Sequence, residues 1–418
     1  MTARHAPDDR PLVLKFGGSA FADLDGYHRV ARYAVRRRAE ARRPLVVVVS
    51  AMSGTTDRLQ RTLDALAADP PARAAAMLLT AGETVSVALL AAALDAAGAP
   101  GCPLPAAATG LLAEGPGDRA ELVSASPETL SGALADCPIA VVPGGQAVDA
   151  AGRTVMLGRN SSDLSAVATA ATLGADTCEL FSDVPGVCTA DPYLVPEART
   201  LTRISYEGVR RMSRHGARVV HEGAVDWAER AGVRLLCRPF PWSGAPEGGT
   251  AVGTGPAAAA VVVHKDSDVW SFRSGRERRS VGGRLRAEGL SVTEFDTADA
   301  ACLAVPAGAR GTARYVRTAR LLDGLCLVTT LGADGRAEHV VVPRPEAAAE
   351  ARRRHLLLYP DTSDTSDVLD APGPAGPAPA KIRSAHSDVL VGPAPAPAQV
   401  PVPAPPPTRR SDGPGPSR

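Results

Sequence analysis

A lysine stands close to a pair of glycines in Lys15-Phe-Gly-Gly-Ser19, near the start of the chain. Glycine lets the backbone turn sharply and lets its N–H groups approach an anion, while a lysine offers a mobile positive charge. These residue types suit an anion held by Lys15 and by the backbone of Gly17 and Gly18. The same string also fits a tight turn between a strand and a helix with an incidental lysine.

Lysine is rare in this chain, which makes Lys15 informative. Three of the 46 basic residues are lysines (Lys15, Lys265 and Lys381), and the others are arginines. Such an arginine excess, together with abundant alanine, is typical of a GC-rich genome. A lysine kept against that background indicates a role that arginine does not fill, so the bias favours a functional Lys15.

A second motif, Gly158-Arg-Asn-Ser-Ser-Asp163, precedes an apolar stretch that ends at Gly174. Ser162 or Asp163 can cap the start of a helix there, and glycine can end it. Arg159 then lies at a helix N-terminus, where free N–H groups and the dipole favour an anion. Arginine can bind a carboxylate through two parallel hydrogen bonds, so we expect a carboxylate site at this turn. Capping alone explains Asp163 but not Arg159.

The third motif is Phe181-Ser-Asp-Val-Pro-Gly-Val-Cys-Thr-Ala-Asp-Pro-Tyr193. Its Pro-Gly and Asp-Pro pairs indicate a loop after a strand. Taken alone, this motif is a common kind of loop. It becomes informative only together with the other motifs.

Short β-rich runs alternate with helical patterns around these motifs. Apolar strands that alternate with helices imply a parallel sheet covered on both faces, with ligands at the carboxyl ends of the strands. The helix predicted from Gly26 carries seven arginines between Arg29 and Arg43, which we interpret as a solvated face. The predicted strands are Leu12 to Phe16, Leu45 to Ser50, Ile139 to Val142, Glu179 to Ser182 and Val233 to Cys237, and the predicted helices are Gly26 to Arg43 and Thr55 to Ala67.

The pattern changes after about Thr254, at a stretch rich in glycine and proline from Pro246 to Gly255. The order of the shorter elements that follow predicts a small β-α-β-β-α-β domain. Its predicted strands are 258–264, 291–295, 301–305 and 325–330, and its predicted helices are 281–288 and 311–319. We expect domains at 11–250 and 256–345, followed by a disordered tail at 346–418 that is rich in proline and alanine.

Composition excludes several classes of function. The formal net charge of +1 lacks the basic excess of a protein that neutralises nucleic-acid phosphates, so we expect no nucleic-acid partner. The seven cysteines are widely spaced, which predicts neither a zinc site nor a disulfide framework. Apolar runs are much shorter than the roughly 20 residues of a membrane span. We therefore expect a cytoplasmic protein without a membrane partner.

The three motifs in this order resemble those of the aspartokinases, in the amino-acid kinase family. Further matching segments are Ser50-Ala-Met-Ser-Gly-Thr-Thr56 after the second strand, the pair Gly82-Glu83, Arg203-Ile-Ser-Tyr206 and Gly216-Ala-Arg-Val-Val-His221. The resemblance runs from about Leu12 to Cys237. It implies a three-layer αβα kinase domain with a mainly parallel sheet, an ACT-like (ferredoxin-like α+β) domain, and ATP-dependent phosphorylation of L-aspartate with Mg²⁺ as cofactor. Aspartokinases usually carry two ACT domains, whereas residues 256–345 have room for a single degenerate one, whose role is left open between regulation and dimerisation alone. We also expect a homodimer.

The same resemblance assigns roles to residues of this chain. Lys15 would bind the transferring phosphate, and Asp163 would position Lys15 or the substrate amine unless it only caps its helix. The implied amino-acid contacts are Ser19, Ser50, Thr56, Glu83, Arg159 and Ser162, with Glu83 on the ammonium group and Arg159 on the α-carboxylate. The implied nucleotide contacts are Gly17, Gly18, Ser182, Asp183, Cys188, Tyr193 and Arg218.

The chain departs from the family pattern at a few of these positions, which leaves alternatives open. Asn160 and Ser161 replace two usual glycines, although asparagine tolerates a positive φ better than most residues. Cys188, Tyr193 and Arg218 replace a usual tyrosine, arginine and lysine on the nucleotide side. One alternative is a kinase of another amino acid in a specialised pathway. Another is a non-catalytic regulatory homologue with an impaired ATP site.

Overall fold

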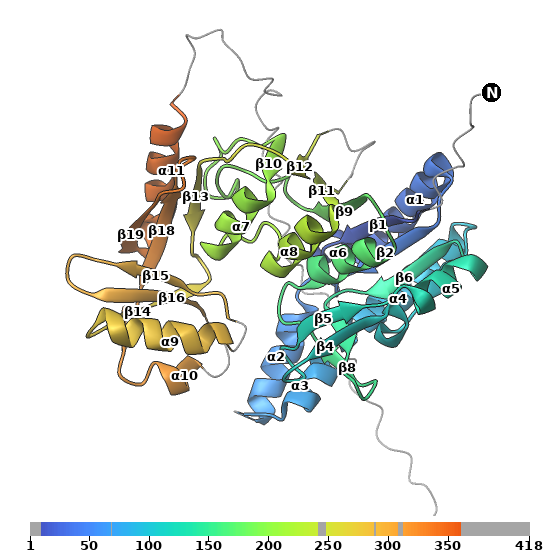
Figure 1. The fold of residues 1–418 in the computed structure, drawn as a ribbon, viewed down its shortest axis with the longest axis horizontal. Coiled ribbons are helices and arrows are strands. Elements are labelled where there is room, and N and C mark those ends of the chain that lie inside the picture. The colour runs from blue at the N-terminus through green and yellow to red at the C-terminus, as the bar shows by residue number, and fades with distance from the viewer. Residues whose placement is uncertain (1–9, 68, 241–247, 288–289, 308–311, 361–418) are drawn as a thin grey trace, which may run out of the picture. The chain divides into compact units, whose positions relative to one another are not determined.

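The computed structural model describes residues 10–67, 69–240, 248–287, 290–307 and 312–360. Its largest sheet has eight strands in the order β10-β12-β11-β9-β1-β2-β6-β3 (Figure 1). All neighbouring strands are parallel except β11 and β12. The strands are β1 (Leu12–Phe16), β2 (Leu45–Val49), β3 (Cys102–Pro103), β6 (Ile139–Pro143), β9 (Thr177–Ser182), β10 (Arg203–Ser205), β11 (Arg234–Pro239) and β12 (Thr250–Gly253).

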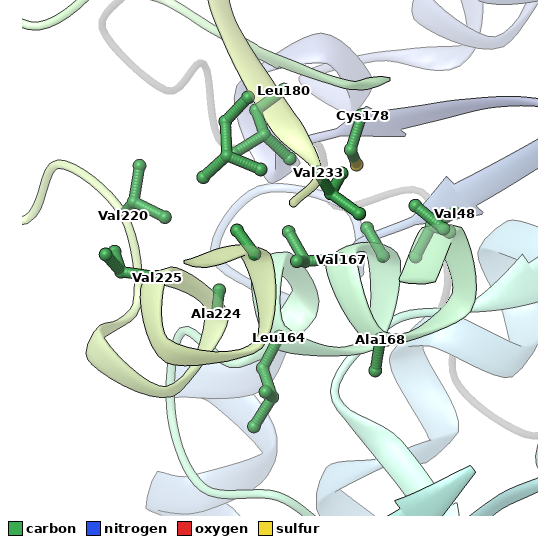
Figure 2. Packing of buried hydrophobic residues seen from close by; sticks show 14 of the residues in the cluster. Val48, Leu164, Val167, Ala168, Cys178, Leu180, Val220, Ala224, Val225 and Val233 are labelled. Carbon is green, nitrogen blue, oxygen red and sulfur yellow. The ribbon is translucent and has the colours of Figure 1, made fainter. Parts of the chain in front are cut away.

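Helices cover both faces of this sheet, because its central strands are apolar on both sides. In β1, Leu14 and Phe16 belong to one core cluster with α1 (Leu24–Ala41) and α4 (Ala81–Ala96). Val13 belongs to another with α6 (Ser162–Thr172) and α8 (Glu222–Ala231), and Figure 2 shows the packing around these two helices. The expected three-layer α/β fold with a mainly parallel sheet is confirmed.

The other elements of the first 250 residues lie around this framework. A four-stranded sheet with the order β5-β4-β7-β8, which the sequence analysis did not predict, packs against the α6 side of the core. Its strands are β4 (Leu111–Glu114), β5 (Glu121–Ala125), β7 (Gln146–Val148) and β8 (Thr154–Met156). The remaining helices are α2 (Thr55–Leu66), α3 (Ala72–Leu79), α5 (Glu128–Asp136), α7 (Tyr206–Arg214) and the 3₁₀ turns η1 (Gly18–Phe21) and η2 (Ala106–Thr109).

The arginine-rich face of α1 is not purely a solvated surface, so that interpretation is partly wrong. Glu179 of β9 is 4% exposed, and the guanidinium of Arg37 donates to its carboxylate at 2.6 Å. A buried carboxylate needs such a partner, since removing it from water is costly. This pair could not be predicted from local sequence patterns, because the two residues are 142 positions apart.

Residues beyond 255 form two antiparallel sheets. One, in the order β15-β16-β14-β17, belongs to a β-α-β-β-α-β unit, and the other has the order β13-β18-β19. The unit comprises β14 (Ser267–Phe272), α9 (Gly275–Ala287), β15 (Thr293–Asp296), β16 (Ala301–Pro306), α10 (Thr312–Tyr315) and β17 (Arg320–Leu321). The other sheet comprises β13 (Ala260–Val263), β18 (Leu325–Leu331) and β19 (Ala337–Pro343).

The predicted order of elements is therefore present, but its outer strands are wrong. The predicted strands 258–264 and 325–330 pair with each other as β13 and β18, and β14 and β17 take the outer positions of the unit. Strand β14 was not predicted because only two of its six residues are buried. Strand β17 was not predicted because it has only two residues. A half-exposed strand lacks the apolar run on which the prediction depended.

The predicted start of the tail at residue 346 is also wrong. After a 3₁₀ turn, η3 (Arg344–Glu346), helix α11 (Ala347–Leu358) packs on β13 and β18 and buries Ala351 and His355. Its alanine content resembles that of the tail, so composition did not separate this helix from the tail. The proline-rich segment itself, from 361 onward, lies outside the described residues.

Among the described residues, the stretch Ala72–Ala96 has the length and mean hydropathy (1.8) of a candidate membrane span, with half of its most apolar window buried. It comprises α3 and α4. Helix α4 packs on α1 and β6, so its place in the protein core accounts for its apolar composition.

Candidate functional site

The carboxyl ends of β1, β2, β6 and β9 meet at one cleft of about 3140 Å³. The cleft exceeds an ordinary small-molecule pocket because it continues along residues beyond 255, such as Lys265 in the turn after β13 and Arg284 in α9. All of the predicted site residues line this cleft, namely Lys15, Gly17, Gly18, Ser19, Ser50, Thr56, Glu83, Arg159, Ser162, Asp163, Ser182, Asp183, Cys188, Tyr193 and Arg218.

Lys15 and Asp163 form an ion pair at the centre of the site. Lys15 lies near the end of β1, Asp163 lies in the first turn of α6, and their Nζ and Oδ1 atoms are 2.7 Å apart. The side chains are 13% and 14% exposed, so solvent screens the pair only partly. The residue before the helix is Ser161, which makes no capping bond through its side chain. Asp163 is the second residue of α6, so it does not occupy the cap position, and its carboxylate pairs with the Lys15 ammonium.

His221, which the sequence analysis did not assign, lies beside this pair. Its backbone N–H donates to Oδ2 of Asp163 at 3.4 Å. Burial lowers the pKa of the His221 imidazole, which favours the neutral ring at neutral pH. Asp163 is therefore held by the Lys15 ammonium and by a backbone N–H.

The glycine pair after β1 makes the predicted sharp turn. The N–H of Gly17 donates to the carbonyl of Phe181 at 3.1 Å and ties the turn to β9. A Cβ on Gly18 would lie 3.0 Å from the carbonyl oxygen of Ala51. The close approach of the loop after β2 therefore leaves little room for a larger residue at position 18. Gly17 and Gly18 line the cleft together with Lys15.

On the β2 side of the cleft, Ser50 and Glu83 face the start of α6 and the loop after β2. The hydroxyl of Ser50 donates to that of Ser162 at 3.0 Å, and the N–H of Ala51 donates to Glu83 at 3.4 Å. Burial raises the pKa of Glu83 to about 7, against hydrogen bonds from Ala51 and Gln146 that lower it. A carboxylate so poorly solvated gains much from a cationic ligand.

Gly144, Gly145 and Gln146 also line or support this part of the site, and the sequence analysis missed them. A Cβ on Gly144 would lie 2.7 Å from that of Ser162, and Gly145 has a φ of 70°. The signal was available in the sequence, since a glycine pair follows the predicted strand at 139–142 after a single proline, Pro143. Carboxyl ends of parallel strands are where such loops carry ligands.

The turn that carries Arg159 keeps its left-handed residue, although Asn160 and Ser161 stand where the family pattern has two glycines. Asn160 adopts a φ of 60°, which confirms that asparagine tolerates the conformation here. The Ser161 hydroxyl is turned inward and donates to the carbonyl of Gly158 at 2.6 Å. Arg159 forms an ion pair with Asp57 in the first turn of α2, where Thr56 also lies. Both charged side chains are more than 60% exposed, so a carboxylate ligand can compete for the guanidinium.

The opposite side of the cleft is formed by the loop after β9. The phenol of Tyr193 donates to Asp183 at 2.9 Å, and Ser182 accepts a hydrogen bond from the N–H of Val184 at 3.4 Å. Burial and the Asp183 carboxylate together raise the pKa of Tyr193 to about 12, so the phenol stays protonated. Arg218 forms an ion pair with Asp266 at 3.1 Å.

Cys188 differs from its neighbours in this loop. It is 6% exposed and packs in an apolar cluster with Val195, Val261 and Ala351. Burial raises the pKa of its thiol, which is therefore protonated at neutral pH. Its side chain packs in the core, and most of it is covered by other residues and so cannot contact a nucleotide.

Comparison with known proteins places this geometry in a family. The model of the amino acid kinase family matches residues 10–238. An aspartokinase of Thermus thermophilus is 40% identical over 227 residues, which are 54% of this chain and 56% of that protein. An aspartokinase of Mycolicibacterium smegmatis is 40% identical over 228 residues, 54% of either chain. The chain thus matches about half the length of these curated relatives.

Solved structures share the fold over a longer stretch. E. coli aspartokinase III in complex with aspartate and ADP aligns with a TM-score of 0.63 and 20% identity, covering 83% of this chain and 99% of that one. The aspartate kinase of Clostridium acetobutylicum aligns with a TM-score of 0.56 and 17% identity, covering 83% and 100%. With the site residues gathered at the ends of β1, β2 and β9, and with more than half of the chain matched by the family model, this protein belongs to the amino acid kinase family.

Proposed function

We propose that this protein uses ATP to phosphorylate the side-chain carboxylate of L-aspartate, giving 4-phospho-L-aspartate and ADP. The Lys15–Asp163 ion pair supports the proposal best, because it lines the same cleft as the glycine turn at 17–18 and the turn that carries Arg159. The aspartokinases of Thermus thermophilus and Mycolicibacterium smegmatis, each 40% identical over the matched region, support it.

The proposed chemistry needs positive charge and alignment rather than a general base. A side-chain carboxylic acid with a pKa near 4 is ionised at neutral pH, so it can attack the γ-phosphorus directly. The main obstacle is repulsion between two anions. Lys15, fixed by Asp163, would lie against the transferring phosphoryl group and offset the charge that develops on its oxygens.

The acceptor would lie on the β2 side of the cleft. Glu83 would bind the ammonium group, and Arg159 would exchange Asp57 for the α-carboxylate. These two contacts would leave the side-chain carboxylate directed toward Lys15. The remaining proposed contacts are hydroxyl donors at Ser19, Ser50, Thr56 and Ser162.

ATP would lie on the β9 side, against Gly17, Gly18, Ser182, Asp183, Tyr193 and Arg218. A Mg²⁺ ion carried by the nucleotide fits this side of the cleft, because the Asp183 carboxylate lines it. Mg²⁺ in kinases is held mainly by phosphates, waters and one or two carboxylates, and Asp183 would be that carboxylate. When bound, the ion neutralises phosphate charge.

A hydroxylamine-trapping assay with aspartate, ATP and Mg²⁺ tests this function. The acyl phosphate product reacts with hydroxylamine, so aspartyl hydroxamate should accumulate with time and enzyme concentration. Absence of hydroxamate at high enzyme concentration, with the protein folded by circular dichroism, would reject the proposal.

A second candidate keeps the reaction but changes the acceptor amino acid. Exposed Asn160, next to Arg159, motivates it, because its amide adds polar groups where the family pattern has glycine. ADP release measured with a panel of amino acids separates the two candidates. Preference for aspartate by more than tenfold in kcat/KM would exclude the alternative acceptor.

We also propose the domain organisation that these functions require. Residues 11–253 would form the kinase domain, since β12 still belongs to the main sheet, and residues 256–360 would form a regulatory domain related to ACT domains. The homodimer stays a prediction that size-exclusion chromatography with light scattering would test.

A further inference from the structure

The loop that would contact the nucleotide is anchored by the C-terminal sheets through Thr189. This residue is fully buried, and its carbonyl accepts a hydrogen bond from the N–H of Val261 in β13 at 2.8 Å. Its hydroxyl lies 2.8 Å from Nε2 of His355 in α11. Strand β13 and helix α11 therefore hold the backbone from which Asp191 and Tyr193 project.

Beyond this anchor, an ion pair reaches into the cleft from the turn between β13 and β14. The ammonium of Lys265 lies 2.7 Å from Oδ2 of Asp191. The other oxygen of that carboxylate, Oδ1, accepts the backbone N–H of Tyr193 at 3.0 Å. Tyr193 in turn donates a hydrogen bond to Asp183. The position of Lys265 therefore affects the positions of the other residues in the loop after β9.

The next residue of the turn holds the second nucleotide-side loop with the opposite charge. Asp266 pairs with Arg218 at 3.1 Å, and buried His264 packs against Gly216, where a Cβ would lie 2.7 Å from its ring. Lys265, Asp266, Asp191 and Arg218 all line the cleft. Two neighbouring residues of opposite charge thus hold two loops that are far apart in the sequence.

We infer that Lys265 and Asp266 are positioning residues for the nucleotide side of the site, acting through Asp191 and Arg218. The inference rests on the proposed function only in taking ATP as the ligand of that side. Lys265 is 49% exposed and Asp266 is likewise 49% exposed, so each pair is worth at most about 1 kcal/mol. Lys265 and Asp266 thus affect the geometry of the nucleotide side and its affinity for the nucleotide. The buried contacts of Thr189, by contrast, contribute to folding.

The test measures binding of a non-hydrolysable ATP analogue by calorimetry, together with the KM values for ATP and aspartate. Lys265→Ala and Asp266→Ala should each weaken analogue binding and raise the KM for ATP by about two- to fivefold. Lys265→Glu should have a larger effect, since it places like charge against Asp191. Lys265→Arg should restore most of the affinity. The KM for aspartate should stay unchanged in all four variants.

The matched control is Arg336→Ala, which removes an exposed ion pair with Asp334 in the hairpin between β18 and β19, outside the cleft. It should leave both KM values and analogue binding unchanged. Unchanged analogue binding in Lys265→Ala and Lys265→Glu, or equal changes in both KM values, would overturn the inference. If the wild type binds the analogue and the variants bind it more weakly, the inference stands even where no aspartyl hydroxamate forms.

Discussion

Lys15 and Asp163 meet because a strand end and a helix start face the same cleft. The arginine-rich composition made Lys15 stand out, and the 2.7 Å contact with Asp163 gives that choice a physical reason. A compact ammonium fits between a carboxylate and a phosphoryl group, whereas the planar fork of arginine needs more room and a different approach. The identity of residue 15 is therefore expected to matter for transfer more than its charge alone.

We predict that Lys15→Arg lowers the rate of aspartyl hydroxamate formation by about 10²- to 10³-fold, because the guanidinium cannot occupy the ammonium position. The same chemical change at Lys265 serves as the control and should keep most of the activity. Circular dichroism should show both variants folded. A Lys15→Arg enzyme within tenfold of the wild type would contradict the assigned role.

We predict that kcat/KM for aspartate falls as the pH drops below about 7. The raised pKa of Glu83 means that its carboxyl group gains a proton in this range and loses its attraction for the substrate ammonium. Initial rates between pH 5.5 and 8.5 measure the effect. Glu83→Gln should have low activity without this inflection, and an inflection that persists in Glu83→Gln would assign it to another group.

At the level of elements, α1 carries a face that is partly ionic and partly exposed. Arg37 is 24% exposed and pairs with buried Glu179, whereas Arg32 on the same helix lies at the surface. Losing one partner of a buried pair is costly, because the remaining charge stays desolvated. Arg238 lies 3.7 Å from the same carboxylate and would offset part of the loss.

We predict that Arg37→Ala lowers the free energy of unfolding by about 1–3 kcal/mol. Arg32→Ala should change it by less than about 0.5 kcal/mol, as for an ordinary surface position. Urea denaturation followed by circular dichroism at pH 7.5 gives both values. Equal stability of the two variants would show that Glu179 needs no partner from α1.

At the level of the whole molecule, three histidines lie where the end of α7 meets the C-terminal sheets. The rings of His215 and His339 are 5.5 Å apart, and the Thr329 hydroxyl lies 3.0 Å from His339 and 3.0 Å from His264. Burial lowers the pKa of all three, to about 4 for His215 and about 3 for His264. Arg211 and Arg214 lower that of His215 further.

We predict that the protein loses stability as the pH falls from about 6.5 toward 4. In that window the unfolded chain binds protons at these histidines while the folded chain does not, so the free energy of unfolding decreases. Above pH 6.5 both states carry neutral rings and the contribution is constant. Urea denaturation at pH 5 and 7.5 measures the difference, which should shrink in His215→Asn and persist in the exposed control His28→Asn.

Local patterns were sufficient to predict most of the first 240 residues, because the motifs are contiguous and each strand end carries its own loop. Strand β1, the glycine turn at 17–18 and the start of α6 could be predicted from local pattern, and so could the meeting of their side chains at the strand ends. The long-range partners of those side chains became known only from the folded chain. The Arg37–Glu179 pair, the bond from His355 to Thr189 and the exchange of β13 for β14 each join segments whose local patterns carry no trace of the other. Charge pairs and strand neighbours depend on distance in space. Periodicity along the chain predicts which residues are buried, but it does not predict which residues they contact.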